Sequence, residues 1–416
     1  MHFKNLLIVI LGCITFQSFA QLTVTGEFRP RTEFRNGYKT LKPDGVDAAF
    51  FTSQRTRLNT SFKAENYMFF VSLQDVRVWG DVSQLNTSDK NGIAIHEAWG
   101  LVNFNDFSIK AGRQEIVYDD HRMFGNVGWA QQGRSHDALL VKFGKEKFKL
   151  DVGLAFNQEG ENLFDTTYTI TGNYKAMQYV WLNNKWENVS ASFLLLNNGL
   201  QYIDATNNDN NEVRYSQTLG SHLKFKLNNN LNAAANLYYQ TGKDVADRDI
   251  SAFLIGLDLA YKASDKVNLG LGFEMQSGND YDGDADENKA FNPFYGTNHK
   301  FNGFMDYFYV GNHLNSVGLT DIFAKFNTKL SSKSDITLFV HNFSSYGEIS
   351  ADVDKQLGTE ADVVFNYKYN NEISIGAGYS QMFASDGLEV VKQNFDGNSN
   401  NWAWLMLTIK PTLFSK

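Results

Sequence analysis

The 416-residue sequence predicts an all-β fold, namely a transmembrane, antiparallel, up-and-down β-barrel of about eighteen strands. Three observations predict it. Apolar and polar residues alternate with period two along most of the chain. The segments between these stretches are long and short in turn. Aromatic residues make up 14% of the chain, with 34 Phe and 19 Tyr. A membrane barrel needs all three features, because its outer face contacts lipid, its rims carry aromatic girdles, and only one side has short turns.

The first twenty residues predict a secretory signal peptide. Lys4 precedes an apolar stretch over residues 6–16, and residues 18–20 (Ser-Phe-Ala) have the small-x-small pattern of a cleavage site. Gln21 is therefore the expected first residue of the mature chain. An alternative, lipidation at Cys13, is disfavoured because the apolar run before it is short and the site at 18–20 is better.

Composition limits what the mature chain can be. Cys13 is the only cysteine, so disulfide frameworks, thiol catalysis and cysteine zinc sites are excluded after cleavage. Four prolines and the lack of a Pro-rich or Ser-rich linker predict that residues 21–416 form one barrel domain. A net charge of −8 argues against nucleic acid as a partner. Past the signal, no apolar run is long enough for a membrane-spanning helix.

Strand periodicity is clearest over residues 147–157, 214–227, 266–277 and 358–370, where apolar residues occupy most of the alternate positions. No amphipathic helix is expected after the signal. The predicted strands cover residues 22–35, 52–63, 66–79, 93–104, 106–115, 137–145, 147–157, 174–183, 187–197, 214–227, 231–241, 252–262, 266–277, 316–330, 335–343, 358–370, 372–383 and 401–412.

The connections between these strands alternate in length. Every gap after an odd-numbered strand has ten residues or more, and every gap after an even-numbered strand has four or fewer. Short turns on the periplasmic side and long loops on the outer side produce this alternation in a membrane barrel. A secreted, soluble β domain is the alternative, but it has no reason to alternate in this way.

The stretch GEFRPRTEFRNG, residues 26–37, shows the two faces of one predicted strand. Phe28 and Phe34 share one parity and are expected to face lipid. The opposite parity carries five charges that are expected to face a water-filled lumen, and these are Glu27, Arg29, Arg31, Glu33 and Arg35. Pro30 lacks a backbone donor, so a bulge or a position near a rim is expected there.

Arginine is concentrated in the first third of the chain, with nine of eleven residues between positions 29 and 134. Arg55 and Arg57 share the lumen parity of their strand. Guanidinium groups bind carboxylates or phosphates in a two-pronged geometry, and such a cluster in a narrow pore favours anions. Alternatively, the arginines pair with lumen acids such as Glu27, Glu33, Asp75, Glu97 and Glu115. Both can hold, because acids can orient some arginines and leave others free.

Several segments resemble the alginate export family of outer-membrane porins. These are LQDVRVWGD (73–81), HEAWG (96–100), IKAGRQE (109–115), WAQQGRSHDALLVKF (129–143) and AFNPFYGTNHKFNGFMDYF (290–308). The resemblance implies an eighteen-stranded barrel with an arginine-lined constriction that passes an acidic polysaccharide. It also implies that Arg77, Glu97, Arg113, Arg134 and Asp137 belong to the pore. The cargo stays open between alginate, another uronate, and a smaller anion or sugar, and either direction of transport is compatible.

The long segment 116–136 is the expected constriction, because it carries Arg122, Trp129 and Arg134. The full set of predicted pore and substrate-binding residues is Arg29, Arg31, Arg55, Arg57, Arg77, Glu97, Arg113, Arg122, Arg134 and Asp137.

The long segment 278–315 contains an alternating acidic sequence, NDYDGDADE, whose spacing suits calcium. The candidate ligands are Asp280, Asp282, Asp284, Asp286 and Glu287. The complete calcium-loop pattern is not met, so a solvated acidic loop tip is the alternative. No other cofactor is expected.

Catalysis is not expected. Ser135, His136 and Asp137 are consecutive, so on an extended chain their side chains point in different directions and form no triad by adjacency. His96 and Glu97 lack the second histidine of a zinc-protease motif. We therefore expect a monomeric porin in the outer membrane of a Gram-negative cell. Its expected partners are membrane lipid, an anionic saccharide and, in the case of export, a periplasmic secretion partner. A general or small-anion porin is the main alternative, and a barrel enzyme or adhesin the lesser one.

Overall fold

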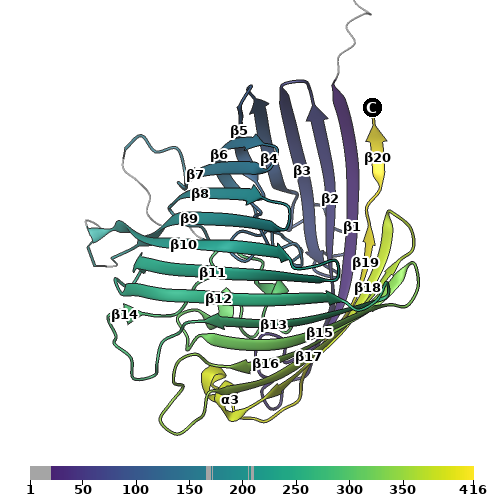
Figure 1. Ribbon diagram of the computed structural model, residues 1–416. Helices are drawn as coiled ribbons and strands as arrows, with labels where there is room; N and C mark the ends of the chain where they lie inside the picture. The colour runs from purple at the N-terminus through teal and green to yellow at the C-terminus, as the bar shows by residue number, and fades with distance from the viewer. Residues whose placement is uncertain (1–19, 165–169, 171, 205, 208–209) are drawn as a thin grey trace, which may run out of the picture.

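The chain forms a closed antiparallel β-barrel of eighteen long strands (Figure 1). The computed structural model describes residues 20–164, 170, 172–204, 206–207 and 210–416, so the predicted signal peptide lies almost wholly outside the described residues. Each strand pairs with its neighbour in sequence, and β1 (Gln21–Asn36) pairs with β19 (Asn400–Ile409) to close the barrel.

The other long strands are β2 (Ala49–Lys63), β3 (Tyr67–Val78), β4 (Ala94–Asn103), β5 (Phe107–Gln114), β6 (His136–Lys145), β7 (Phe148–Phe156), β8 (Ala176–Lys185), β9 (Val189–Tyr202), β10 (Glu212–Lys226), β11 (Leu231–Lys243), β12 (Asp249–Lys262), β13 (Val267–Gln276), β15 (Leu319–Lys329), β16 (Ser334–Ser344), β17 (Gln356–Lys368) and β18 (Ile373–Ala384). All eighteen predicted strands are confirmed, with shifts of a few residues at their ends.

Smaller elements were not predicted. β20 (Thr412–Ser415) follows β19 and pairs with the start of β1, while β14 (Glu287–Asn288) pairs with β12. Short helical segments lie within the long loops, namely α3 (Asp386–Lys392), α2 (Val310–His313) and the 3-10 turn η2 (Asn298–Lys300). These helices are too short to show a periodic apolar face in the sequence. No described helix has the length and apolar character needed to cross a membrane.

Turn lengths alternate as predicted, with two numerical exceptions. The connection between β9 and β10, residues 203–211, has nine residues rather than ten or more. The connection between β11 and β12, residues 244–248, has five residues rather than the expected ten or more, because both strands extend beyond the predicted ends. Both connections are still longer than every turn on the other edge of the barrel, where no connection exceeds four residues.

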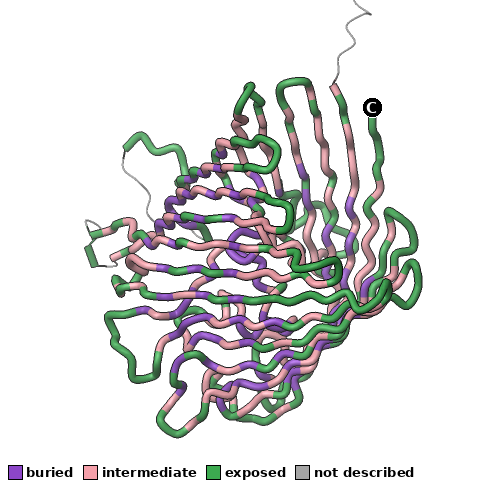
Figure 2. Tube along the Cα trace, in the orientation of Figure 1, coloured by how far each residue is buried: buried purple, intermediate pink, exposed green. Residues whose placement is uncertain are grey.

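The two faces of β1 are as the alternation predicts. Glu27, Arg29, Arg31 and Glu33 are buried inside the barrel, and Phe34 on the other face is 40% exposed. Figure 2 shows this alternation of buried and exposed positions along the strands. Apolar side chains form the exposed outer face of the wall, for example Phe69, Leu139, Leu195, Leu257, Ile322 and Leu405.

Pro30 lies in the middle of β1, so the expectation of a bulge or a rim position was wrong. Its pairing with Gln54 belongs to an unshifted β1–β2 register that runs from Gln21 to Arg35. On the other side, Phe28 pairs with Ile409 and Arg31 with Met406, and the residues between them make no pair. The missing donor of Pro30 therefore falls at the β1–β19 seam, where one hydrogen bond is omitted without a change of register.

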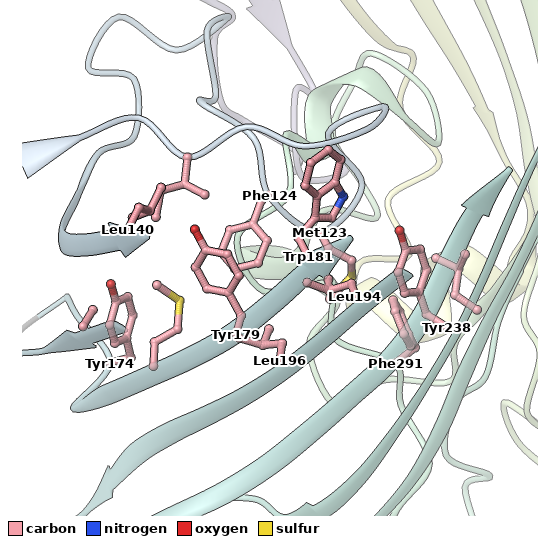
Figure 3. Packing of buried hydrophobic residues seen from close by; sticks show 14 of the residues in the cluster. Met123, Phe124, Leu140, Tyr174, Tyr179, Trp181, Leu194, Leu196, Tyr238 and Phe291 are labelled. Carbon is pink, nitrogen blue, oxygen red and sulfur yellow. The ribbon is translucent and has the colours of Figure 1, made fainter. Parts of the chain in front are cut away.

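Long loops fill part of the barrel interior. Phe124 and Met123 pack against inward side chains of β8 to β12 such as Tyr179, Leu196 and Tyr238 (Figure 3). A second cluster packs the loop before β15 against β15 to β19, with Met305, Tyr307 and Phe308 beside Phe343, Leu357, Met382 and Trp402. These two clusters fill part of the barrel interior with packed side chains and position the loops that form the candidate site.

Candidate functional site

A row of arginines lines the inner face of β1 and β2. The strand register sets Arg29 directly opposite Arg55, and Glu27 opposite Arg57. Arg29, Arg31 and Arg55 are each less than 8% exposed, which is unusual for a charged side chain without partners. The parity argument for these four arginines is confirmed as to the direction in which they point.

Their partners are backbone carbonyls of the loop between β5 and β6, which we call the crossing loop (residues 115–135). Arg29 Nη1 donates to the Gly128 carbonyl at 2.7 Å, and Arg31 Nη1 donates to that of Trp129 at 2.7 Å. Arg57 Nη2 donates to the Gln132 carbonyl at 3.2 Å. The carbonyls of Ala130 and Gln131 accept hydrogen bonds from Arg55. The arginine row thus holds a stretch of loop backbone against the wall.

Acidic groups and an aromatic ring complete this contact. Glu33 accepts from Arg31 at 2.9 Å and from Arg35 at 2.9 Å, while Glu27 pairs with Arg55. The Arg31 guanidinium lies 4.2 Å from the centre of the Trp129 ring, within the range of a cation–π interaction. The alternative that acids pair with the arginines therefore applies to Glu27 and Glu33, and also to Asp75 with Arg77 and Glu115 with Arg57.

The other end of the crossing loop reaches the opposite wall. The indole of Trp181 on β8 donates to Asp119 at 3.0 Å, and the amide of Asn236 on β11 donates to Asp120 at 2.7 Å. Arg122, which is 1% exposed, donates to Glu274 on β13 and to Asn302 at 3.0 Å. The loop is therefore anchored on both sides of the barrel and crosses its lumen.

A second loop, the companion loop (residues 289–318), supports the first. Arg134 donates to the Gly296 carbonyl at 2.9 Å, and Val127 N donates to the Thr297 hydroxyl at 3.1 Å. Asp306 accepts from Tyr38 at 2.6 Å and contacts His299 at 2.9 Å. Burial alone would raise the pKa of Asp306, but His299 and the hydrogen bonds from His299 and Tyr38 hold that pKa below its ordinary value.

A cavity of about 800 Å³ lies beside the two loops, against β1 to β3. Its lining includes the aromatic side chains of Tyr38, Phe51, Trp129 and Tyr309. Five basic and three acidic residues also line it: Arg31, Arg35, Lys39, Arg77 and Arg134, and Glu33, Asp81 and Asp306. The cavity wall thus has a positive balance, although the whole chain carries a net charge of −8.

Three predicted pore residues are on the outward parity of their strands. Arg113 pairs with Asp137 at 2.9 Å across β5 and β6, and Asp137 is on the parity of the exposed Leu139, so both face outward. Arg77 stands beside Gln54, on the face opposite to Arg55, and pairs with Asp75 and Asp89. The register contradicts a lumen-facing role for the side chains of Arg113 and Asp137, whose motif positions carried no information on parity. Arg77 has the outward parity too, but at the end of β3 it still contributes to the cavity lining.

The remaining predicted residues are placed inside the barrel. Glu97 accepts from the Trp99 indole at 3.0 Å and from the backbone N–H of Glu115 at 3.0 Å. Arg122 and Arg134 lie in the crossing loop, as expected. The sequence interpretation missed a group of buried side chains on the far wall, on β13 to β17: Glu274, Asp321, His341, Glu360 and Asp362. Alternation marked Asp362 as inward, but nothing distinguished it from other polar inward residues.

The acidic residues at positions 280–287, just before the companion loop, do not lie close together as the ligands of one metal ion would. Asp280 accepts from the N–H of Glu348, and Glu287 pairs with Lys289. Within the described part of the chain, the one group of three or more His or acidic ligand atoms lying within 4.8 Å of one another is His96, Glu97 and Glu115. Calcium binding by Asp280, Asp282, Asp284, Asp286 and Glu287 stays a prediction.

The comparison with protein families decides the relationship. The family model described as alginate export matches residues 20–399. The chain belongs to the alginate export family. No curated protein matches the sequence closely enough to count as a relative.

Solved structures agree on the fold of this alginate export family member. Acinetobacter baumannii OccAB4 aligns with a TM-score of 0.65 at 12% identity, over 95% of this chain and 99% of that one. Acinetobacter baumannii OccAB1 aligns with a TM-score of 0.64 at 13% identity, over 96% and 99%. The outer membrane protein opdK from Pseudomonas aeruginosa gives 0.62 at 10%, over 95% and 99%. Together with the closed barrel, the family makes this protein an outer-membrane channel and not an enzyme.

Proposed function

We propose that the channel passes anionic solutes passively and that its cargo is an acidic polysaccharide or oligosaccharide of the alginate kind. The observation that carries this proposal is the positive balance of the cavity wall beside the crossing loop, in a chain whose net charge is −8. A cleft lined by one sign of charge raises the local concentration of the opposite ion. The family's description adds support for the saccharide.

Arg35 is the side chain best suited to meet a carboxylate in this cavity. It uses Nε and Nη2 for Glu33, and its side chain stays 33% exposed. Arginine's planar group accepts carboxylates in two-pronged contacts. Tyr38 and Tyr309 add apolar faces to the same cavity, and a site with apolar walls and a few charged groups suits a sugar acid better than a bare inorganic anion.

The arginine row has a different part in this proposal from the one that the sequence suggested. The backbone of the crossing loop is held by Arg29, Arg31, Arg55 and Arg57. These arginines therefore fix the position of the constriction and are covered by the loop. Solutes meet the cations that remain at the cavity, which are Arg35, Lys39 and Arg134. The barrel wall presents apolar side chains to the outer-membrane lipid. We propose that one chain forms the working channel and that, in the case of export, a periplasmic partner delivers the saccharide.

Titration of the single-channel current in a planar bilayer tests the saccharide. We expect oligouronates to reduce the current of the wild-type channel, while a neutral oligosaccharide of equal length leaves it unchanged. Arg35→Glu should weaken this block about tenfold, the equivalent of ~1.4 kcal/mol. Arg113→Glu is the matched control, because Arg113 faces outward.

Two other outcomes of this titration would count against an acidic saccharide as the cargo. Equal block by charged and neutral oligosaccharides would contradict recognition of the carboxylate. A current that neither oligosaccharide affects would favour the small-anion porin.

A further inference from the structure

An irregularity in β4 brings two potential metal ligands to the same face of the barrel wall. Ser72 on β3 pairs with Glu97, and the next residue, Leu73, pairs with Ile95, so His96 is the extra residue of a β-bulge. In a regular strand, His96 and Glu97 would point to opposite faces. The bulge lets both point into the barrel, where His96 is 3% exposed and Glu97 is half-buried.

A third ligand comes from the start of the crossing loop. Glu115 follows the last residue of β5, and its Oε1 lies 2.8 Å from His96 Nε2. One ligand atom from each of the three residues lies within 4.8 Å of the other two. Around a tetrahedral ion with bonds of about 2.0–2.2 Å, ligand atoms are about 3.3–3.6 Å apart. Small side-chain rotations are therefore enough to place all three on one ion.

The surroundings hold these ligands in place. A Cβ added at Gly133 of the crossing loop would lie 2.8 Å from His96 Cε1, and Gly133 has a φ of +69°, so only glycine lets the loop pack here. Asn126 donates to Glu115 Oε2 at 2.8 Å, which leaves Oε1 directed at His96. Side chains fixed by such contacts lose little freedom when they bind an ion.

Charge also favours a cation. The two carboxylates face one guanidinium, because Arg57 Nη1 lies 3.9 Å from Glu115 Oε1. His96 must be neutral to bind a metal ion. The two carboxylates and Arg57 then have a net negative charge, which a divalent ion would make positive. An imidazole ligand selects first-row transition metals over calcium and magnesium, which prefer all-oxygen sites.

We propose that His96 Nε2 and the carboxylates of Glu97 and Glu115 form a site for a divalent transition-metal ion such as Zn²⁺. Binding replaces the His96–Glu115 hydrogen bond by two bonds to the ion; the neutral imidazole then carries its one ring proton on Nδ1, and a second ring proton, where one is present, is released to solvent. Three protein ligands leave one position for water or for the carboxylate of a passing solute. The ion joins the β4 wall to the first residue of the crossing loop. This inference does not depend on the cargo of the channel.

Isothermal titration of the refolded barrel, in detergent and without a polyhistidine tag, tests the site with Zn²⁺ as the probe. We expect one ion per chain, no displacement by excess Ca²⁺, and an at least tenfold weaker affinity in both His96→Ala and Glu97→Gln. The glutamine variant keeps an oxygen for the Trp99 indole and the Glu115 N–H, so its fold is preserved. Heat-modifiable gel mobility confirms folding of each variant.

His121→Asn is the matched control, since it removes a histidine of the crossing loop that lies outside the trio. It should bind Zn²⁺ like the wild type. Failure of the folded wild type to bind Zn²⁺, or equal binding by wild type, His96→Ala and Glu97→Gln, would overturn the proposal. Loss of binding in His121→Asn alone would do the same.

Discussion

Replacing residues 117–134 with a short Gly-containing turn should raise the single-channel conductance several-fold. The segment crosses the lumen from the arginine row on β1 and β2 to Glu274 on β13, so its removal opens the path of ions. The replacement is feasible because Gln114 and His136 are directly paired, which places the two strand ends within reach of a tight turn.

The same deletion should also make the pore more selective for anions. Arg29, Arg31, Arg55 and Arg57 now donate to loop carbonyls or to Gln131, and without the loop they would face water in the lumen. Shortening the exposed loop between β3 and β4 over residues 82–90 is the control, and it should leave conductance unchanged. If the crossing-loop deletion conducts like the wild type, that loop does not form the constriction.

The second large effect is expected at the contact between Arg122 and Glu274. Both side chains are buried, at 1% and 6% exposure. Removing one partner of a buried ion pair leaves an uncompensated charge, at a cost of about 3–5 kcal/mol. Arg122→Met should therefore release the far end of the crossing loop, which amide hydrogen exchange over residues 118–126 would show as faster exchange. Bilayer recordings should show increased open-channel noise.

A double replacement separates the charge from the packing. Arg122→Met combined with Glu274→Leu removes both charges, and it should recover much of the protection that the single change loses. Arg35→Met is the control, because the Arg35–Glu33 pair is partly exposed and contributes little. If Arg122→Met and Arg35→Met exchange alike, the contact with Glu274 does not anchor the loop.

The barrel was predictable from the sequence because the physics of the wall is local. Each strand alternates between lipid and lumen, and short turns mark one edge, so strand number and facing follow from periodicity alone. Arg29, Arg31, Arg55 and Arg57 were placed correctly for this reason. Arg113 and Asp137 were placed wrongly because motif position was used where parity would have shown an outward face.

The interior was less predictable because it depends on contacts between distant segments. Nothing in the sequence near Arg29 indicates that its partners are carbonyls about a hundred residues away. A single extra residue at His96 changes the face of its neighbour, and alternation cannot show such a bulge in advance. The buried acids opposite the arginine row, such as Glu274 and Asp321, become distinctive only when the loops cover them.

The reversal potential of the refolded wild-type channel in a planar bilayer, under a salt gradient, tests anion preference most directly. We expect a potential of the sign that marks anion selectivity, and a shift towards cations in Arg35→Glu but not in the outward-facing Arg113→Glu. A cation-selective wild-type potential, or equal shifts in the two variants, would contradict the assignment of the cavity as the path of anions.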